Sequence, residues 1–418
     1  MEVLKMDNEY EVVVIGGGAA GLAGAIKAND LGLRTLILES NQRLGGIPFQ
    51  CAHPGFGNFY YNENLTGAEY AERLIDSIIE RKISYLTSAH VTRIKHHEPL
   101  HKSIKLISTN GIKEIHTSTI IYTTGARERH LYETGIKGDR TSGVYTAGEA
   151  QTLMDIHGIM PGKNIVIIGS GDIGLIMARR FALEGANVVC CIELFPYPGG
   201  LSRNVVQCLH DFNIPLYTSC MVTEIKGKKR VEKVITVDVD DQLNRIRGTK
   251  KEIECDTVAL ATGLIPYTKK LEEIHISIDP CTMGPRVTDE LETSVPGIFA
   301  AGNVIAINDY VDYASDQGEL AATGAHHHIM ENGRSKKSGI PVEIKGNVRL
   351  IVPQYISCKR DVTLYFRVKH PRPRATIHIH ELEITIEKQG VTPSEMIKFS
   401  LKKEDLQHIN DALTVEVS

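Results

Sequence analysis

The chain has 418 residues, a formal net charge of −4 and a hydrophobic fraction of 42%. This length exceeds one ordinary core and predicts two or three domains of roughly 100–200 residues each. The charge balance excludes the basic excess with which proteins follow a phosphate backbone, so we expect no nucleic-acid partner.

The N-terminus carries charged residues before its first apolar run, and no uninterrupted apolar segment approaches about 18 residues. We therefore expect neither a signal peptide nor a membrane span. The eight cysteines are scattered without CxxC spacing, which is typical of reduced thiols rather than of a disulfide framework or a zinc site. These features predict a cytoplasmic protein with no metal site.

The first predicted unit is a strand, a glycine turn and a helix. Residues 11–15 form the apolar, β-branched run of a buried parallel strand, and residues 19–32 continue with good helix formers. Gly16, Gly18 and Gly21 lie at the junction. In a dinucleotide-binding turn these glycines would make the tight turn, admit a pyrophosphate to the backbone, and let helix and strand pack closely. The alternative is a glycine-rich turn that binds nothing.

The next predicted strand, "RTLILES", ends at Glu39, where a carboxylate can accept hydrogen bonds from ribose hydroxyls. The stretch "KNIVIIGSGDIGLIMARRFALEGANVVCCIEL" then repeats this order of strand, glycine turn, helix and second strand with a terminal acid. Its residues are Gly169, Gly171, Gly174 and Glu193.

Glu193 suits a free ribose 2′-hydroxyl and would repel a 2′-phosphate, which favours NAD over NADP, although Arg203 nearby could still contribute to phosphate binding. The alternative is that this second unit has lost its nucleotide and only packs.

Two apolar runs ending in Thr-Gly, "TIIYTTGARER" and "DTVALATGLIP", bracket the second glycine cluster, and "PGIFAAGNV" then forms another strand with a glycine turn. This order predicts an α/β fold with two Rossmann-like dinucleotide-binding domains, the second inserted in the first. The first domain is expected over residues 1–125 and 263–337, and the second over residues 126–262.

After the polar linker "ENGRSKKSG", short alternating runs predict a small antiparallel, β-rich C-terminal domain over residues 338–418. Docking of another subunit, dimerisation and a purely stabilising role remain open for it.

Together these motifs resemble the two-dinucleotide-binding-domain flavoproteins, the pyridine nucleotide–disulfide oxidoreductase superfamily, over roughly residues 10–335. The resemblance implies that the split domain binds FAD and that the inserted domain binds NAD, with NADP possible. Asn303 stands where the family carries an acid, and its amide can still bond a ribityl hydroxyl. The resemblance adds these cofactor-binding residues: Arg43, Gly46, Val91, Thr124, Gly125, Gly263, Gly302, Asn303, Gln317 and Gly318.

More narrowly, "GGIPFQCAHPGFGNFYYNENLTGAEYAERL", "GVYTAGEAQTLMD" and "AGNVIAINDYVDYASDQGE" resemble a subgroup without the redox dithiol. That subgroup includes flavin subunits of opine oxidase, hydrogen cyanide synthase and dye-linked proline dehydrogenase. It also includes oxidoreductases encoded beside glycerol-3-phosphate dehydrogenase and a small cysteine-rich protein, and the β-rich C-terminal extension favours this kind.

This resemblance implies an FAD-dependent NAD(P)H oxidoreductase that passes electrons between a nicotinamide and a partner subunit or small acceptor. The implied partners are a small-molecule redox substrate, a glycerol-3-phosphate dehydrogenase-like subunit, a small cysteine-rich protein and a second copy of the chain. A flavin subunit of an amino acid, amine or opine dehydrogenase or oxidase is the alternative, and a non-catalytic nucleotide-binding scaffold is a third possibility.

Cys51 and His53 follow Gly46 in the segment that, by this resemblance, runs beneath the flavin ring. Cys51 is either a lone redox thiol or a small buried hydrophobe, and His53 is either a proton donor or a structural histidine. We expect Asp309 and Asp312 to cap the helix that follows them. We expect the histidine run 326–328 to be a solvated helix end, because consecutive helical residues point about 100° apart and cannot converge on one metal ion.

Overall fold

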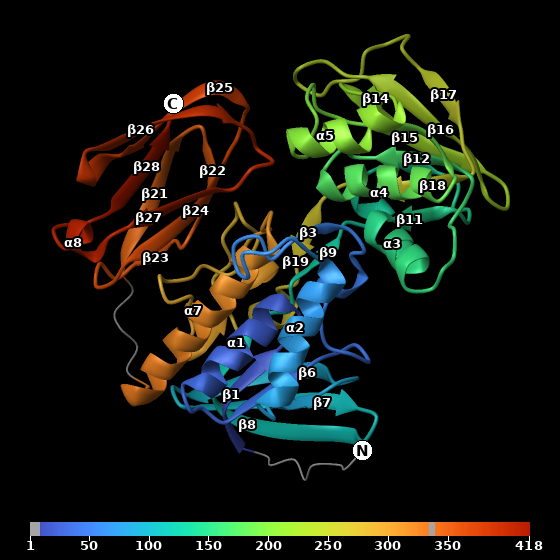
Figure 1. Cartoon of the computed structure of the whole chain (residues 1–418). Coiled ribbons are helices and arrows are strands. Elements are labelled where there is room, and N and C mark those ends of the chain that lie inside the picture. Colours follow the sequence, from blue (N-terminus) through green and yellow to red (C-terminus); the bar gives the residue numbers. More distant parts are fainter. Residues whose placement is uncertain (1–8, 334–338) are drawn as a thin grey trace. The chain divides into compact units, whose positions relative to one another are not determined.

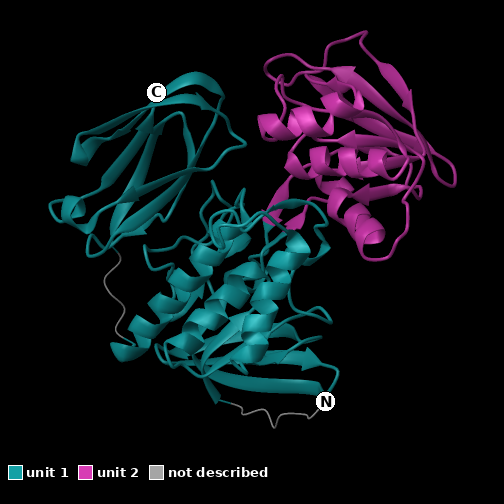
Figure 2. Ribbon diagram, in the orientation of Figure 1, with its two compact units in different colours: residues 1–126, 266–418 teal, residues 127–265 magenta. Residues whose placement is uncertain are grey.

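The computed structural model describes residues 9–333 and 339–418. The charged N-terminal residues 1–8 and residues 334–338 of the predicted linker lie outside this part. The chain forms two compact units (Figure 2), of which unit 1 comprises residues 1–126 and 266–418 and unit 2 comprises residues 127–265. The predicted α/β fold class, with Rossmann-like parallel sheets and a C-terminal β domain, is confirmed.

The largest sheet of unit 1 is mixed and seven-stranded, in the order β5–β2–β1–β8–β7–β6, with β20 also paired to β8 (Figure 1). The strands β5, β2, β1, β8 and β20 run parallel, and β6 and β7 form an antiparallel extension. The bounds are β1 Glu9–Ile15, β2 Thr35–Leu38, β5 Ser84–Leu86, β6 His90–Glu98, β7 His101–Ser108, β8 Gly111–Tyr122 and β20 Ile298–Ala300. The carboxyl ends of the parallel strands therefore meet at one edge of the sheet.

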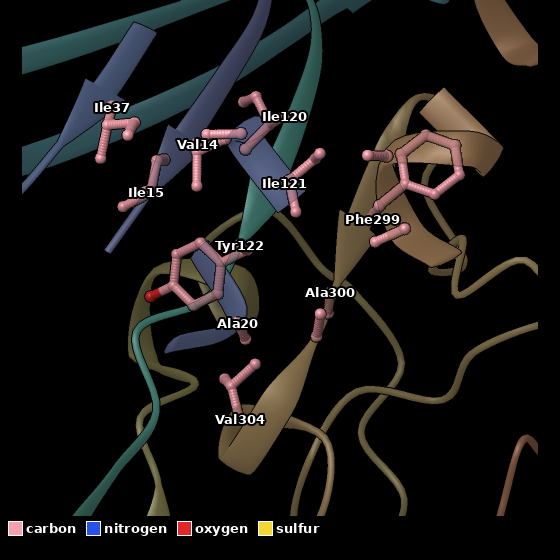
Figure 3. Packing of buried hydrophobic residues seen from close by; sticks show 14 of the residues in the cluster. Val14, Ile15, Ala20, Ile37, Ile120, Ile121, Tyr122, Phe299, Ala300 and Val304 are labelled. Carbon is pink, nitrogen blue, oxygen red and sulfur yellow. The ribbon is translucent and has the colours of Figure 1, made fainter. Parts of the chain in front are cut away.

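The core of unit 1 forms where apolar side chains of the sheet meet helices (Figure 3). Val14, Ile121 and Phe299 are buried on neighbouring strands, and Ala20 and Val304 pack from the segments that follow the strand ends. Small residues at the start of the first helix let it approach the sheet closely.

Three long helices accompany this sheet: α1 Ala19–Asp30, α2 Gly67–Glu80 and α7 Val311–Met330. Helix α2 begins with a capping box, in which the Thr66 hydroxyl and the Glu69 carboxylate each bond the other residue's backbone N–H. Helices α1 and α7 cross so closely that a Cβ added to Gly318 would lie 2.0 Å from the Ala20 carbonyl oxygen. Glycine is therefore required at this crossing.

Unit 2 is built on a five-stranded parallel sheet in the order β11–β18–β12–β13–β14. A second sheet, β10–β15–β16–β17, packs with it around a shared apolar core. The bounds of its helices and strands are β10 Lys137–Gly138, β11 Val144–Thr146, α3 Ala147–Asp155, β12 Asn164–Ile168, α4 Asp172–Leu183, β13 Asn187–Ile192, α5 Ser202–Cys208, β14 Leu216–Tyr217, β15 Cys220–Gly227, β16 Val231–Asp238, β17 Lys251–Glu254 and β18 Thr257–Leu260.

The C-terminal domain has its own apolar core between a five-stranded sheet, β23–β21–β28–β25–β26, and a three-stranded sheet, β22–β24–β27. The prediction of a wholly antiparallel domain was wrong, because β21 and β28 pair in parallel. The bounds are β21 Ile340–Gly346, β22 Val348–Val352, β23 Tyr355–Ile356, β24 Val362–Val368, β25 Arg372–Ile379, β26 Ile384–Val391, β27 Ile397–Leu401 and β28 Leu413–Val417.

The remaining short strands and α-helices are β3 Pro54–Phe56, β4 Leu65–Thr66, β9 Ala126–Glu128, β19 Leu264–Pro266, α6 Lys269–Glu272 and α8 Lys403–Leu406. Within the described residues, none of the helices has both the length and the apolarity that a bilayer crossing requires.

Candidate functional site

The first glycine loop lies between β1 and α1, at the carboxyl edge of the parallel strands. Gly16 has a φ of +109°, and a Cβ added there would lie 2.5 Å from the Thr123 carbonyl oxygen. A Cβ on Gly21 would lie 1.9 Å from the Gly16 carbonyl oxygen. Both positions therefore require glycine for the turn and for the contact between helix and strand. The Thr123 hydroxyl donates to the Ile15 carbonyl oxygen at 3.0 Å and so supports the turn from β8.

The start of α1 presents backbone rather than side chains. Gly18 is the N-cap residue, in extended conformation. Gly46 lies opposite, since a Cβ added to it would be 2.8 Å from the Gly18 Cα, and the Gly45 N–H donates to the Gly17 carbonyl oxygen at 2.8 Å. Uncovered N–H groups at a helix N-terminus, together with the helix dipole, favour an anionic group such as a phosphate.

Glu39 lies beside this loop at the end of β2, and its side chain is buried. One carboxylate oxygen accepts from the Gly17 N–H at 2.7 Å, and the other accepts from the Asn41 N–H, also at 2.7 Å. These two bonds fix the carboxylate against the glycine loop. The position is the one at which a ribose could be recognised.

The second glycine loop repeats this geometry between β12 and α4 in unit 2. Gly169 has a φ of +100°, and a Cβ on Gly174 would lie 2.4 Å from the Gly169 carbonyl oxygen. Gly171 is the N-cap of α4. A Cβ added to Gly171 would meet no heavy atom within 4 Å in the described part of the chain, so this point faces open space.

Glu193 takes in this unit the place that Glu39 has in the first. It is buried, and one carboxylate oxygen accepts from the Ser170 N–H at 3.0 Å and from the Ser170 hydroxyl at 2.5 Å. The other oxygen accepts from the Phe195 N–H at 3.0 Å. Arg203 is exposed on α5. The contribution of Ser170 was not predicted, because its neighbours in sequence give no sign of the bond to Glu193.

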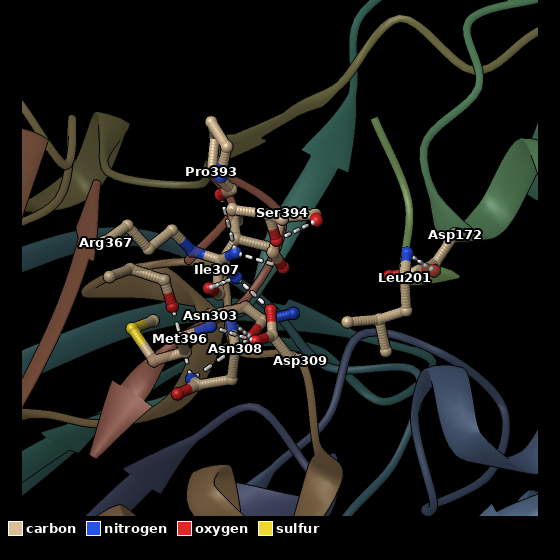
Figure 4. Close-up of polar contacts among 12 residues, drawn as sticks. Asp172, Leu201, Asn303, Ile307, Asn308, Asp309, Arg367, Pro393, Ser394 and Met396 are labelled. Atoms are coloured by element: carbon tan, nitrogen blue, oxygen red, sulfur yellow. Dashed lines mark hydrogen bonds and ion pairs between the residues drawn. The ribbon is translucent and has the colours of Figure 1, made fainter. Parts of the chain in front are cut away.

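A chain of amide side chains lies where β20 leads toward α7. The Gly302 N–H donates to the buried Gln317 side-chain oxygen at 3.0 Å, and the Gln317 amide donates to Asn308 at 3.2 Å. The Asn308 N–H donates in turn to the Asn303 side-chain oxygen at 3.0 Å (Figure 4). The structure thus brings together three predicted residues, Gly302, Asn303 and Gln317. Asn308, which joins them, was not predicted.

Cys51 and His53 lie in the segment after Gly46. Cys51 is buried, and its thiol donates to the Ile47 carbonyl oxygen at 3.4 Å. His53 is half-buried, with Nδ1 3.0 Å from the Pro54 carbonyl oxygen and its ring 5.3 Å from that of Phe56. Both residues have structural contacts, and their two proposed chemical roles remain hypotheses.

The other predicted cofactor-binding residues are spread over the two units. Arg43 is exposed and lies 3.8 Å above the ring of Phe49, while Val91 is buried in β6. The Thr124 hydroxyl donates to the Tyr267 carbonyl oxygen at 3.1 Å. Gly125 and Gly263 have positive φ values of +67° and +101° and lie close in sequence to the two boundaries between the units, after residues 126 and 265. Gly318 lies in the α1–α7 contact described above.

Two predictions about the segment 309–328 were wrong. Helix α7 has Tyr310 as its N-cap, so Asp309 precedes the helix and Asp312 lies inside its first turn. Asp312 is buried, and one of its carboxylate oxygens accepts from the Phe59 N–H at 3.1 Å and the Tyr60 N–H at 2.8 Å. It fixes a distant loop instead of capping its own helix.

The histidine run is not simply a solvated helix end. His326 and His327 are half-buried, but His328 faces the core, with Nδ1 3.1 Å from the Glu292 carboxylate and Nε2 3.0 Å from the Pro99 carbonyl oxygen. Three consecutive helical residues point in three directions, so one of them necessarily faces the protein. Among the described residues, no three His, Cys, Asp or Glu side chains gather in a metal-binding arrangement.

The two glycine loops therefore fit a dinucleotide each. Each loop ends a buried parallel strand, opens a twelve-residue helix through a glycine N-cap, and carries a buried carboxylate held on a loop N–H. A pyrophosphate needs backbone N–H groups without intervening side chains, and a ribose needs an acceptor beside them.

Comparisons with known proteins agree with this geometry. The family model described as pyridine nucleotide-disulphide oxidoreductase matches residues 10–326. The mitochondrial dihydrolipoyl dehydrogenase of Caenorhabditis elegans is 28% identical over 347 residues, covering 76% of this chain and 68% of that protein. An alkyl hydroperoxide reductase component of Staphylococcus aureus is 28% identical over 328 residues, covering 77% of this chain and 60% of that protein. The chain thus spans between 60% and 68% of these relatives.

Solved structures show the same fold. Thioredoxin reductase of T. acidophilum superposes with a TM-score of 0.64 at 27% identity, covering 78% of this chain and 100% of that chain. L-proline dehydrogenase from P. horikoshii superposes with a TM-score of 0.57 at 17% identity, covering 79% of this chain and 57% of that chain, which is a likeness of fold alone.

Proposed function

The chain belongs to the pyridine nucleotide-disulphide oxidoreductase family, which makes it an FAD-dependent oxidoreductase, and we propose that it moves electrons between a nicotinamide nucleotide and an acceptor outside the chain. The observation that carries this proposal is the pair of matching glycine loops, one in each unit. Each loop has a buried carboxylate, Glu39 or Glu193, bonded to a loop N–H.

FAD would bind to the residues of unit 1. The N–H groups at the start of α1 would bind its diphosphate, Glu39 would accept from its adenosine ribose, and the amide chain around Gly302 and Gln317 would contact the rest of the molecule. When bound, this cofactor supplies a ring that can take up or release a hydride. The protein would hold and orient the cofactor and would exclude water from the site.

The nicotinamide nucleotide would bind to unit 2. We propose NAD rather than NADP, because the buried Glu193 carboxylate would repel a 2′-phosphate. The open space at Gly171 would admit the pyrophosphate to the N-terminus of α4.

The cysteines support a route for electrons without a dithiol. Within the described residues, none of the eight forms a disulfide. Burial raises the pKa of Cys190 and of Cys255 to about 12, and that of Cys208 to about 11, so these thiols stay protonated near neutral pH and are poor nucleophiles. Cys51 is buried without a second cysteine near it in sequence. Electrons would then pass to a partner subunit or to a small acceptor.

The partners that we propose follow the same logic. A dehydrogenase subunit of the glycerol-3-phosphate type, with a small cysteine-rich protein, would supply the missing relay, and reduced thiols suit the cytoplasm. Co-purification from the native host tests this assignment. If the chain is recovered alone and has full NADH-dependent activity toward a small acceptor, then that acceptor takes the electrons and no partner subunit is needed.

The experiment that tests the function is anaerobic titration of the FAD-reconstituted protein with NADH. Rapid bleaching of the flavin bands is the expected result. Bleaching by an amine, amino acid or opine, with no response to NADH, would favour the flavin subunit of a dehydrogenase or oxidase instead. A protein that stays colourless after reconstitution would exclude both.

A further inference from the structure

Arg367 joins the C-terminal domain to the loop that precedes α7. Its guanidinium leaves β24 and pairs with the Asp309 carboxylate, and it also donates to the Ile307 carbonyl oxygen at 3.1 Å. Both side chains are almost fully buried, at 11% and 4% exposure. The other Asp309 oxygen accepts from the Met396 N–H, from a second segment of the C-terminal domain (Figure 4).

The same guanidinium also fixes that second segment. It donates to the Pro393 carbonyl oxygen at 3.1 Å and to the Ser394 carbonyl oxygen at 2.5 Å. Met396 then packs into the core of the first domain. Four acceptors thus converge on one buried cation, which is a demanding and specific arrangement.

The held loop is the one that orders the amide chain. Asn308 lies between the two positions that Arg367 contacts, and it donates to Asn303 at 3.0 Å and accepts from Gln317 at 3.2 Å. Gln317 in turn accepts from the Gly302 N–H. An unbroken series of contacts therefore runs from the C-terminal domain to three of the predicted flavin-binding residues.

We propose that Arg367 is a positioning residue for the flavin site: by neutralising Asp309 and fixing residues 307–309, it sets the geometry and the charge of the amide chain at Gly302. The C-terminal domain would then contribute to the geometry and the charge of the flavin site. The inference rests on the proposed function where it names the flavin as the ligand. The ordering of the loop can be measured without any ligand.

Arg360 provides the matched control. It also lies in the C-terminal domain and also pairs with carboxylates of the first domain, but these belong to Glu290 and Asp289, outside the loop 302–309. If Arg367 only attached one domain to the other, R367M and R360M would have the same kind of effect.

The first measurement is amide hydrogen exchange of the two variants without FAD. We expect residues 302–309 to exchange about tenfold or more faster in R367M than in R360M, because R367M removes the guanidinium that bonds both Ile307 and Asp309. Equal exchange in this loop in both variants would overturn the proposal, whether or not the chain binds FAD.

The second measurement is the flavin midpoint potential of R367M and D309N, compared with R360M. R367M removes the positive charge beside the buried Asp309 carboxylate, so reduction of a bound flavin becomes harder and the potential falls. D309N keeps an acceptor oxygen but leaves the Arg367 cation without its counter-charge, so reduction becomes easier and the potential rises. A purely structural role would not produce opposite signs, and shifts of the same sign would overturn the proposal. If R367M fails to fold, D309N against R360M still decides the question.

Discussion

The two glycine loops share one backbone plan but differ in the residue that follows the first glycine. In the first loop this residue is Gly17, where an added Cβ would lie 2.6 Å from a Leu44 methyl carbon and 3.2 Å from a Glu39 carboxylate oxygen. In the second loop it is Ser170, whose hydroxyl donates to Glu193 and accepts from the Gly199 N–H at 2.8 Å. At this position the first loop has no room for a side chain, whereas the second holds a serine side chain that bonds two neighbouring segments.

The segments that cover the two loops also differ, because a backbone bond holds the first cover and side chains hold the second. Over the first loop, Gly45 bonds directly to the Gly17 carbonyl oxygen. Over the second, the Asp172 carboxylate accepts from the Leu201 N–H at 2.8 Å (Figure 4). It also accepts from the Asn204 side-chain amide at 2.7 Å. A cover held by backbone bonds suits a ligand that is retained, and a cover held through side chains suits a ligand that comes and goes. We expect FAD to be held far more tightly than NADH.

The largest effect should come from a valine at the N-cap glycine of each helix. G18V should weaken FAD binding by about 100-fold, or about 2.7 kcal/mol, with NADH binding unchanged, because the side chain would stand where the phosphate approaches the backbone. G171V should do the reverse. Isothermal titration of each variant with both nucleotides checks this, and loss of both ligands in either variant would show a folding defect.

Removing the charge of each carboxylate should have a smaller effect. Gln at position 39 keeps one acceptor oxygen but cannot accept from both Gly17 and Asn41. We expect E39Q to weaken FAD binding about tenfold, or about 1.4 kcal/mol. E193Q should weaken NADH binding by a similar factor and reduce the preference for NADH over NADPH. An unchanged preference in E193Q would refute the assignment of Glu193 to the ribose.

Exchanging the residue that follows the first glycine of each loop should affect stability more than binding. S170G removes two hydrogen bonds and should lower the free energy of unfolding by about 1–2 kcal/mol. G17S crowds the buried Leu44 side chain and should cost about 1 kcal/mol or more. Urea unfolding measures both. A stabilising G17S would show that the first loop has room that the structure denies it.

The smallest effect should come from Thr123, the residue that follows β8 and supports the first turn. Thr123 bonds the Ile15 carbonyl oxygen, and T123A should lower the free energy of unfolding by about 1 kcal/mol. In unit 2 the carbonyl oxygen nearest an added Gly169 Cβ belongs to Ala261, which offers no hydroxyl. A T123A variant as stable as the parent would mean that the first turn, like the second, needs no such bond. The same unfolding assay decides it.

The sequence predicts what local chemistry determines. The positions of Gly16 and Gly169, the strands before them, the helices after them and the acids that follow are all readable, because turn, strand and helix preferences act over a few residues. Contacts between distant segments are not readable in this way. Asp312 holds the backbone of residues 59–60 from 252 positions away, and Arg367 holds Asp309 from 58 positions away.

His328 illustrates the same limit. Its burial depends on which side of α7 faces the sheet, and three adjacent histidines give no periodic signal from which to infer that side. Asn308 gives no signal in the sequence for the same reason, since only the fold brings it between Asn303 and Gln317.

The central claim, that each unit has its own nucleotide, is tested most directly by amide hydrogen exchange of the unmodified protein with each nucleotide added separately. FAD should slow exchange in residues 16–20 and 302–304 and leave residues 169–173 unchanged, whereas NADH should slow exchange in residues 169–173. Protection of the same loop by both nucleotides, or of neither loop by FAD, would contradict the account.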